Sequence, residues 1–120
     1  MKILFVDDRL EEIISLWERS GCASNHELLP LEPFQSIERT CELVRTHLPD
    51  VIFIGFGLGC PHTTGVDVIR ALRKQGCSGE IVGNSGGGKT QFENKGIILN
   101  RNINRNSTTL KETIYAIRSN

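Results

Sequence analysis

The chain has 120 residues, the length of one domain, and its 38% hydrophobic and 23% charged residues exclude general disorder. Fourteen basic and fourteen acidic side chains cancel to a net charge of zero, which excludes the basic surface of a general nucleic-acid or membrane binder. The apolar runs have the length of strands and are too short to span a bilayer. We therefore expect one cytoplasmic domain over residues 1–120, with neither nucleic acid nor membrane among its partners.

The first half of the chain alternates between apolar runs and amphipathic segments. The apolar runs have the length of buried strands, and the segments between them place apolar residues at the spacing of one helix face. Pro30 cannot donate a hydrogen bond to a sheet, so the strand that contains it is expected at an edge. We predict, in this order, a strand at Lys2–Val6, a helix at Arg9–Ser20, an edge strand at Glu27–Leu31, a helix at Pro33–His47 and a strand at Val51–Ile54.

The second half repeats this alternation with shorter and more glycine-rich pieces. We predict a loop at Gly55–Thr64, a helix at Val66–Lys74, a strand at Glu80–Gly83, a loop at Asn84–Gly88, a short helix at Thr90–Asn94, a strand at Ile97–Leu99 and a helix at Thr108–Arg118. Ser107 is the expected N-cap of the last helix. Strands that alternate with amphipathic helices indicate a parallel sheet covered by helices on both faces.

Several stretches resemble the receiver domain of two-component response regulators. They include the first strand ending in Asp7-Asp8, the Leu48-Pro-Asp50 segment before the third strand, and Gly65 followed by Val-Asp-Val-Ile-Arg-Ala-Leu-Arg. The order and spacing of these pieces extend the resemblance over essentially the whole chain. It implies a flavodoxin-like (CheY-like) doubly wound fold, with a five-stranded parallel sheet in the order 2-1-3-4-5.

In that family an aspartate at the end of the third strand accepts a phosphoryl group. An acidic pair binds magnesium, and a Ser or Thr and a Lys hold the phosphoryl oxygens, because the nucleophile and the transferred group are both anionic. By this resemblance Asp7 and Asp8 match the acidic pair, Ser85 matches the hydroxyl residue and Arg101 falls at the lysine position. The acceptor position falls on Gly55, which has no side chain.

The resemblance therefore implies a pseudo-receiver, a stand-alone module that lacks the phosphoacceptor aspartate and is not an enzyme. We expect it to take part in two-component signalling through protein–protein contacts that do not depend on phosphorylation. The expected partner is a histidine kinase, another regulator or an output protein. A homodimer is a further expectation, through the face of the fourth helix, fifth strand and fifth helix, roughly Lys89–Asn120.

The acidic pair has three interpretations that the sequence leaves open. Asp7 and Asp8 can bind magnesium weakly, since the third carboxylate of the site is missing. Asp8 can instead cap the first helix. In the third interpretation, Arg101 lies across the two acids as a salt bridge and replaces the metal ion.

A different function is suggested by the segment Gly83-Asn-Ser-Gly-Gly-Gly-Lys-Thr90. It fits the phosphate-binding loop pattern, with Gly83, Gly88, Lys89 and Thr90 at the defining positions and a predicted strand before it. The alternative is therefore a small nucleotide- or phosphate-binding protein. Against it, the helix that follows is short, and only 30 residues remain after Thr90.

Overall fold

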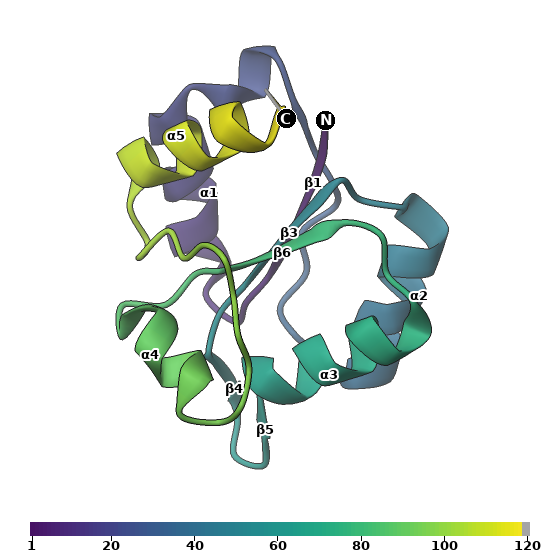
Figure 1. Cartoon of the computed structure of the whole chain (residues 1–120). Coiled ribbons are helices and arrows are strands. Elements are labelled where there is room, and N and C mark those ends of the chain that lie inside the picture. Colours follow the sequence, from purple (N-terminus) through teal and green to yellow (C-terminus); the bar gives the residue numbers. More distant parts are fainter. Residues whose placement is uncertain (119–120) are drawn as a thin grey trace.

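The computed structural model describes residues 1–118, and helices cover both faces of a parallel sheet in it (Figure 1). The sheet has four strands in the spatial order β2-β1-β3-β6, namely β1 (Lys2–Val6), β2 (Glu27–Leu28), β3 (Val51–Ile54) and β6 (Glu80–Gly83). The helices are α1 (Leu10–Ser20), the 3-10 turn η1 (Cys22–Ser24), α2 (Ile37–His47), α3 (Gly65–Gln75), α4 (Gly88–Glu93) and α5 (Ser107–Arg118).

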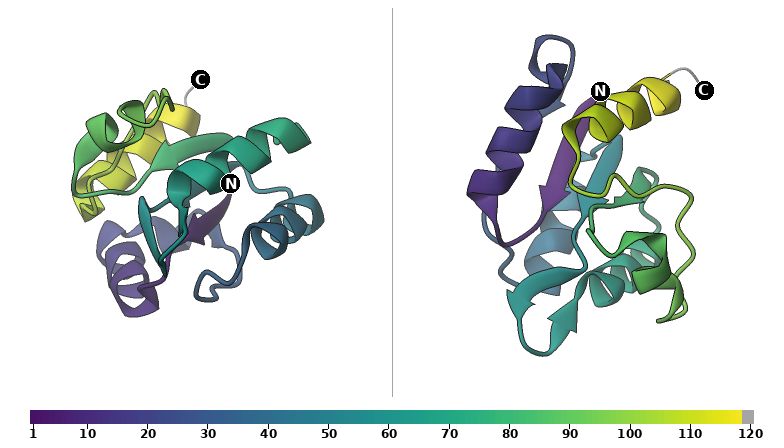
Figure 2. Two further views of the ribbon diagram at one scale, coloured as in Figure 1. Left: turned by 90° about the horizontal axis from the view of Figure 1, so that it is seen from below. Right: turned by 90° about the vertical axis from the view of Figure 1, so that its left-hand side faces the viewer.

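The alternation of side chains along the central strands divides the core into two halves. Successive residues of a strand point to opposite faces, and both faces of this sheet are buried, which explains why β1 and β3 are continuously apolar. One half contains Ile3, Phe5, Val51 and Phe53, packed beneath α1 and α5. The other contains Leu4, Val6, Ile52 and Ile54, packed against residues of α2 and α3. The two pairs of helices are seen on opposite sides of the sheet in Figures 1 and 2.

Local signals set most helix boundaries where the sequence places them. Gly21 ends α1 in the left-handed conformation (φ 73°), which glycine adopts without strain. Thr64 and Asp67 form a reciprocal capping box at the start of α3. The predicted N-cap of α5 is wrong, because the Asn106 side chain, and not that of Ser107, accepts the hydrogen bond from the Thr109 amide (2.9 Å).

The prediction of a fifth strand at Ile97–Leu99 is wrong. The predictions of five strands in the sheet and of the full order 2-1-3-4-5 fail for the same reason. The amide of Ile97 donates back to the Phe92 carbonyl (3.0 Å), so this segment folds against α4 instead of joining the sheet. Arg73 of α3 holds the same segment by donating to the Ile98 carbonyl (2.8 Å). The chain meets the edge of β6 only later, at a single parallel bridge between Gly83 and Asn102.

The predicted loop after β3 contains an antiparallel hairpin, formed by β4 (Gly57–Cys60) and β5 (Thr63–Thr64). The hairpin projects beyond the carboxyl ends of the parallel strands (Figure 1; Figure 2, right). Leu58, buried in the core, anchors it. Directly after it, Gly65 starts α3 so close to Gly55 that any Cβ at residue 65 would overlap the Gly55 carbonyl oxygen. The path of the backbone over β3 therefore requires glycine at this point.

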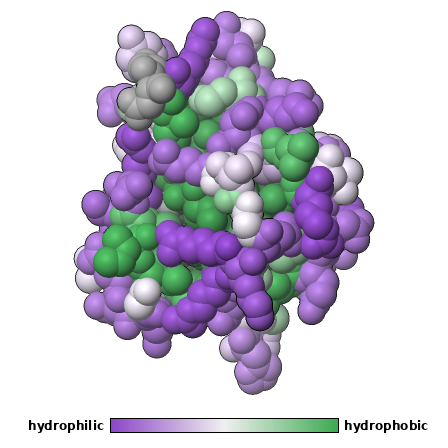
Figure 3. Space-filling model, turned by 45° about the vertical axis from the view of Figure 1, so that its right-hand side comes forward, coloured by the Kyte–Doolittle hydropathy of each residue, from purple (hydrophilic) through white to green (hydrophobic). Residues whose placement is uncertain are grey.

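Few large apolar side chains are exposed on the surface. On the face seen in Figure 3, apolar residues appear as separate patches bordered by hydrophilic ones. Ile14, Leu48, Ile98 and Tyr115 are the large hydrophobic residues that are exposed within the described part of the chain. Among residues 1–118, no helix combines the length and the apolar character that crossing a membrane requires.

Candidate functional site

Asp7 lies at the carboxyl end of β1 and is almost completely buried, with 3% of its surface exposed. Its Oδ1 accepts hydrogen bonds from the backbone amides of Asp8 (2.8 Å) and Arg9 (3.1 Å) as the chain turns into α1. Burial disfavours the charged carboxylate and raises its pKa from 3.8 to about 6, an effect strengthened by the neighbouring Asp8 side chain. Asp7 is therefore a buried carboxyl group with a raised pKa, located where the parallel strands end.

Gly55 lies directly beside Asp7, at the carboxyl end of β3. Its amide donates to the Val6 carbonyl (3.0 Å), which continues the pairing of β1 and β3. A Cβ built on Gly55 would lie 2.7 Å from Asp7 Oδ2, closer than real contacts allow. The Asp7 carboxylate thus fills the space that a side chain at residue 55 would need.

The hairpin covers the second acid in a similar way. Gly59 of β4 has a left-handed conformation (φ 72°), and a Cβ there would lie 2.8 Å from Asp8 Oδ2. Both acids are therefore packed against glycine backbone, Asp7 against Gly55 and Asp8 against Gly59.

Ser85, the residue matched to the hydroxyl position, is buried and held within its own loop. Its amide donates to Asn102 Oδ1 (3.0 Å), and its hydroxyl hydrogen-bonds with Gln91 Oε1 and accepts from the Gly87 amide. Its neighbour Asn84 instead lines a pocket together with Asp7. The structure therefore brings Asn84, which the sequence analysis did not single out, to the acidic end of the sheet.

Arg101 does not reach the acidic pair, so the proposed salt bridge across Asp7 and Asp8 is wrong. Its Nε donates to Glu80 Oε2 (2.9 Å) at the start of β6. The basic residue that shares a pocket with Asp7 is Arg105, whose Nη1 pairs with Glu12 Oε2 of α1 (3.1 Å). Arg105 has a left-handed backbone conformation (φ 57°), which the surrounding sequence does not predict.

The two aspartates do not form a complete metal site. Within residues 1–118, no three side chains of the His, Cys, Asp and Glu types gather where they could share a metal ion. Asp7 Oδ1 is already committed to two amides. The donor set does not fit tight magnesium binding, which relies on carboxylates in a strict octahedral arrangement completed by water and phosphate oxygens.

The glycine-rich loop does not have the form of a phosphate cradle. Such a cradle needs free backbone amides, but three amides of the loop already have acceptors within the protein. They are the amides of Ser85, Gly87 and Gly88. Lys89 and Thr90 lie exposed on α4, which has only six residues, whereas the motif normally opens a long helix.

No protein-family model matches the sequence, and no curated protein matches it either. The structure, in contrast, is similar to solved response regulators and receiver domains. A DNA-binding response regulator of the LuxR family from Staphylococcus aureus superposes with a TM-score of 0.73 at 15% identity, over 97% of both chains. A Francisella receiver domain gives 0.73 at 17% identity, over 99% of this chain and 98% of the other.

A receiver domain protein from Clostridium thermocellum gives a TM-score of 0.68 at 20% identity, over 98% of this chain and 94% of its own. At these identities the similarity shows the fold. The chain therefore has an α/β fold with a parallel sheet, of the kind found in response regulator receiver domains.

We predict that replacing Asp7 with Asn removes a pH dependence of stability. The folded chain holds the Asp7 proton more tightly than the unfolded chain, so the unfolding free energy should fall as pH rises from about 4 to about 6. The fall attributable to this group should be about 2–3 kcal/mol, from a pKa shift of roughly two units. Asp7→Asn keeps the Oδ1 acceptor without a buried charge, so it should be more stable than the natural chain above pH 6.

Urea unfolding across this pH range measures the effect. Glu11→Gln is the matched control, because Glu11 is an exposed acid of the same pocket, and it should change stability by less than about 0.5 kcal/mol. An Asp7→Asn variant that loses stability at pH 8 would show that the Asp7 carboxylate is stabilising in its charged form.

Proposed function

We propose that this chain is a pseudo-receiver, which takes part in two-component-type signalling by binding other proteins without being phosphorylated on aspartate. The likeness of its fold to receiver domains supports the signalling role. The observation that carries the proposal is the pair Gly55 and Asp7. Where a receiver has its acceptor carboxylate, this chain has bare backbone, and Asp7 Oδ2 occupies the adjoining space.

The surrounding groups support the same proposal. Phosphoryl transfer needs a nucleophile, a cation and donors aimed at the transferred oxygens. The Ser85 hydroxyl is bound within its loop, and Arg101 is paired with Glu80. We propose at most weak magnesium binding at Asp7 and Asp8, and we assign the chain no catalytic residue.

The partner surface that we propose comprises α4, the segment at residues 97–99 and α5. Ile98 and Tyr115 are exposed by 73% and 72%, and Lys95 and Lys111 are exposed beside them in the sequence. Apolar and aromatic side chains in a polar surround are typical of transient protein interfaces. The proposed partner is a histidine kinase, another regulator, an output protein or a second copy of the chain. Ser119 and Asn120, which end the predicted face, lie outside the described residues.

Acetyl phosphate tests the absence of phosphorylation. We expect the intact mass of the chain to stay unchanged after incubation with acetyl phosphate and magnesium, because residue 55 offers no nucleophile. The matched variant is Gly55→Asp, which restores the carboxylate but must displace Asp7 to do so. An increase of one phosphoryl mass on the natural chain, lost again on treatment with hydroxylamine, which cleaves the acyl phosphate of an aspartate, would contradict the proposal.

Charged substitutions test the partner surface. Ile98→Asp should weaken copurification of the signalling partner, or self-association in sedimentation velocity, by about tenfold or more, as for the loss of one apolar contact residue at an interface. Leu48→Asp is the control, because Leu48 is a similarly exposed apolar residue (68%) outside the proposed surface. Equal effects of the two substitutions would contradict the proposed partner surface.

A further inference from the structure

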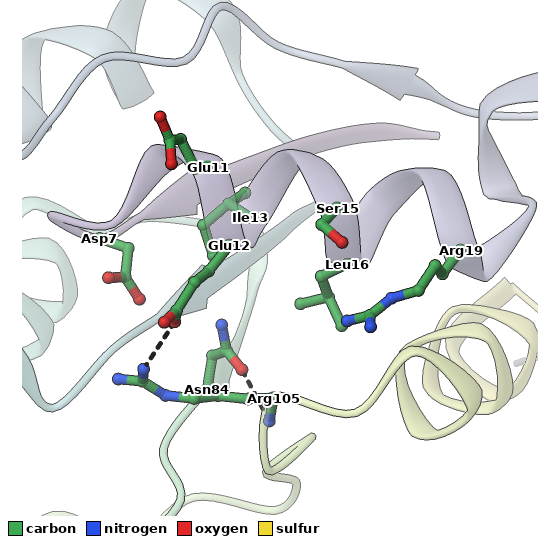
Figure 4. A pocket seen from close by; sticks show the side chains of 9 residues that line it. All are labelled: Asp7, Glu11, Glu12, Ile13, Ser15, Leu16, Arg19, Asn84 and Arg105. Atoms are coloured by element: carbon green, nitrogen blue, oxygen red, sulfur yellow. Dashed lines mark hydrogen bonds and ion pairs between the residues drawn. The ribbon is translucent and has the colours of Figure 1, made fainter.

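A pocket of about 400 Å³ lies between α1 and the two segments that carry Asn84 and Arg105 (Figure 4). Its apolar wall is formed by Ile13 and Leu16 of α1, and its polar groups come from both sides. The volume is within the range of small-molecule sites, which combine an apolar lining with a few placed polar groups. Nothing in the proposed signalling role uses this pocket.

Asn84 presents its side-chain amide to the pocket. The residue is only 1% exposed, and its Oδ1 accepts a hydrogen bond from the Arg105 amide (3.0 Å). This bond fixes the amide orientation, so that Nδ2 is the atom that points toward α1 in Figure 4. Nδ2 is thus oriented to donate to a molecule bound in the pocket. The pocket therefore contains a side-chain donor that a ligand can use.

The pocket contains side chains of both charges, and one opposite pair, Glu12 and Arg105, is in direct contact. Asp7 and Glu11 lie at one end of α1, and Arg19 lies at the other end of the same helix (Figure 4). Arg105 uses one of its five N–H donors on Glu12, which leaves others for a ligand. A metal ion offers no acceptor to Asn84, and a simple phosphate offers no cation to Asp7. The lining therefore suits a ligand that carries an ammonium and a carboxylate together.

We propose that this pocket binds a free α-amino acid with an apolar side chain. The ligand's ammonium donates to the Asp7 carboxylate, its carboxylate accepts from Asn84 Nδ2 and from Arg105, and its side chain packs on Ile13 and Leu16. This inference is independent of the pseudo-receiver proposal. Amino-acid binding and phosphoryl transfer are separate measurements, and either can fail without the other.

L-leucine and L-phenylalanine, titrated to millimolar concentration and followed by amide NMR, are the direct test. We expect saturable shifts centred on Asn84, Ile13 and Leu16. Leucinamide lacks the carboxylate and 4-methylpentanoate lacks the ammonium. Each should bind about tenfold more weakly than L-leucine, the loss expected for a hydrogen bond to a charged group.

Two variants separate the pocket from the rest of the surface. Asn84→Asp keeps the acceptor for the Arg105 amide but loses the donor, so it should weaken L-leucine binding by about tenfold or more. Asn94→Asp makes the same chemical change at an exposed position and should leave binding unchanged. The proposal is overturned if neither amino acid shifts the pocket amides of the natural chain, or if L-leucine, leucinamide and 4-methylpentanoate bind alike. The ligand series needs only the natural chain, so it decides the question even if Asn84→Asp does not fold.

Discussion

The close contact between the Asp7 carboxyl group and the backbone of Gly55 is the constraint around which the carboxyl edge of the sheet is arranged. The pairing of β1 with β3 fixes both residues side by side, through the bond from the Gly55 amide to Val6. Because residue 55 has no Cβ, Asp7 Oδ2 can approach to a distance that no side chain would permit. The Asp7 carboxylate is buried at this point, and its burial raises its pKa to about 6.

Neighbouring segments depend on this arrangement. Gly65 allows α3 to begin against the Gly55 carbonyl, and Gly59 lets the hairpin lie over Asp8. On the other side, the turn after Asp7 leads into α1, which forms one wall of the pocket that we propose binds an amino acid. The chain thus has a fold of the kind found in receiver domains, and at its carboxyl edge the buried Asp7 carboxyl group packs against the backbone of Gly55. Under our proposals, the chain acts by binding partner proteins and a small ligand, and not by phosphoryl transfer.

The sequence predicted the elements whose signals are local. The apolar runs of β1 and β3 need two covered faces, and Gly21 stops α1 by its own conformational freedom. Amphipathic spacing alone does not fix the buried face of α1, since Ile14 is 43% exposed while Leu16 is buried. Ile97–Leu99 is a short apolar run of the kind that forms buried strands, but the Ile97 amide donates to the Phe92 carbonyl, a preference that depends on packing and not on pattern.

The site was harder to predict because its contacts join distant parts of the chain. Asp7 and Gly55 were recognised by their places after apolar strands. Arg105 was not linked to this site, because its ion pair with Glu12 crosses the chain from α1 to the segment before α5. Asn84 gave no signal that distinguished it from Ser85, since only the direction of each side chain shows which one faces the pocket. Arg101 had the expected charge, but Glu80 lies closer to it than the acids do.

The most direct test of the central claim is a titration of the natural chain with magnesium and then beryllofluoride, a stable mimic of the phosphoryl group, followed by amide NMR. The account predicts that beryllofluoride adds no shift at Asp7, Gly55 or Ser85 beyond any small local change that magnesium produces. Shifts that spread from Gly55 to Ser85 and into α4 on addition of beryllofluoride would contradict it. They would show that this edge of the sheet still holds a phosphoryl group.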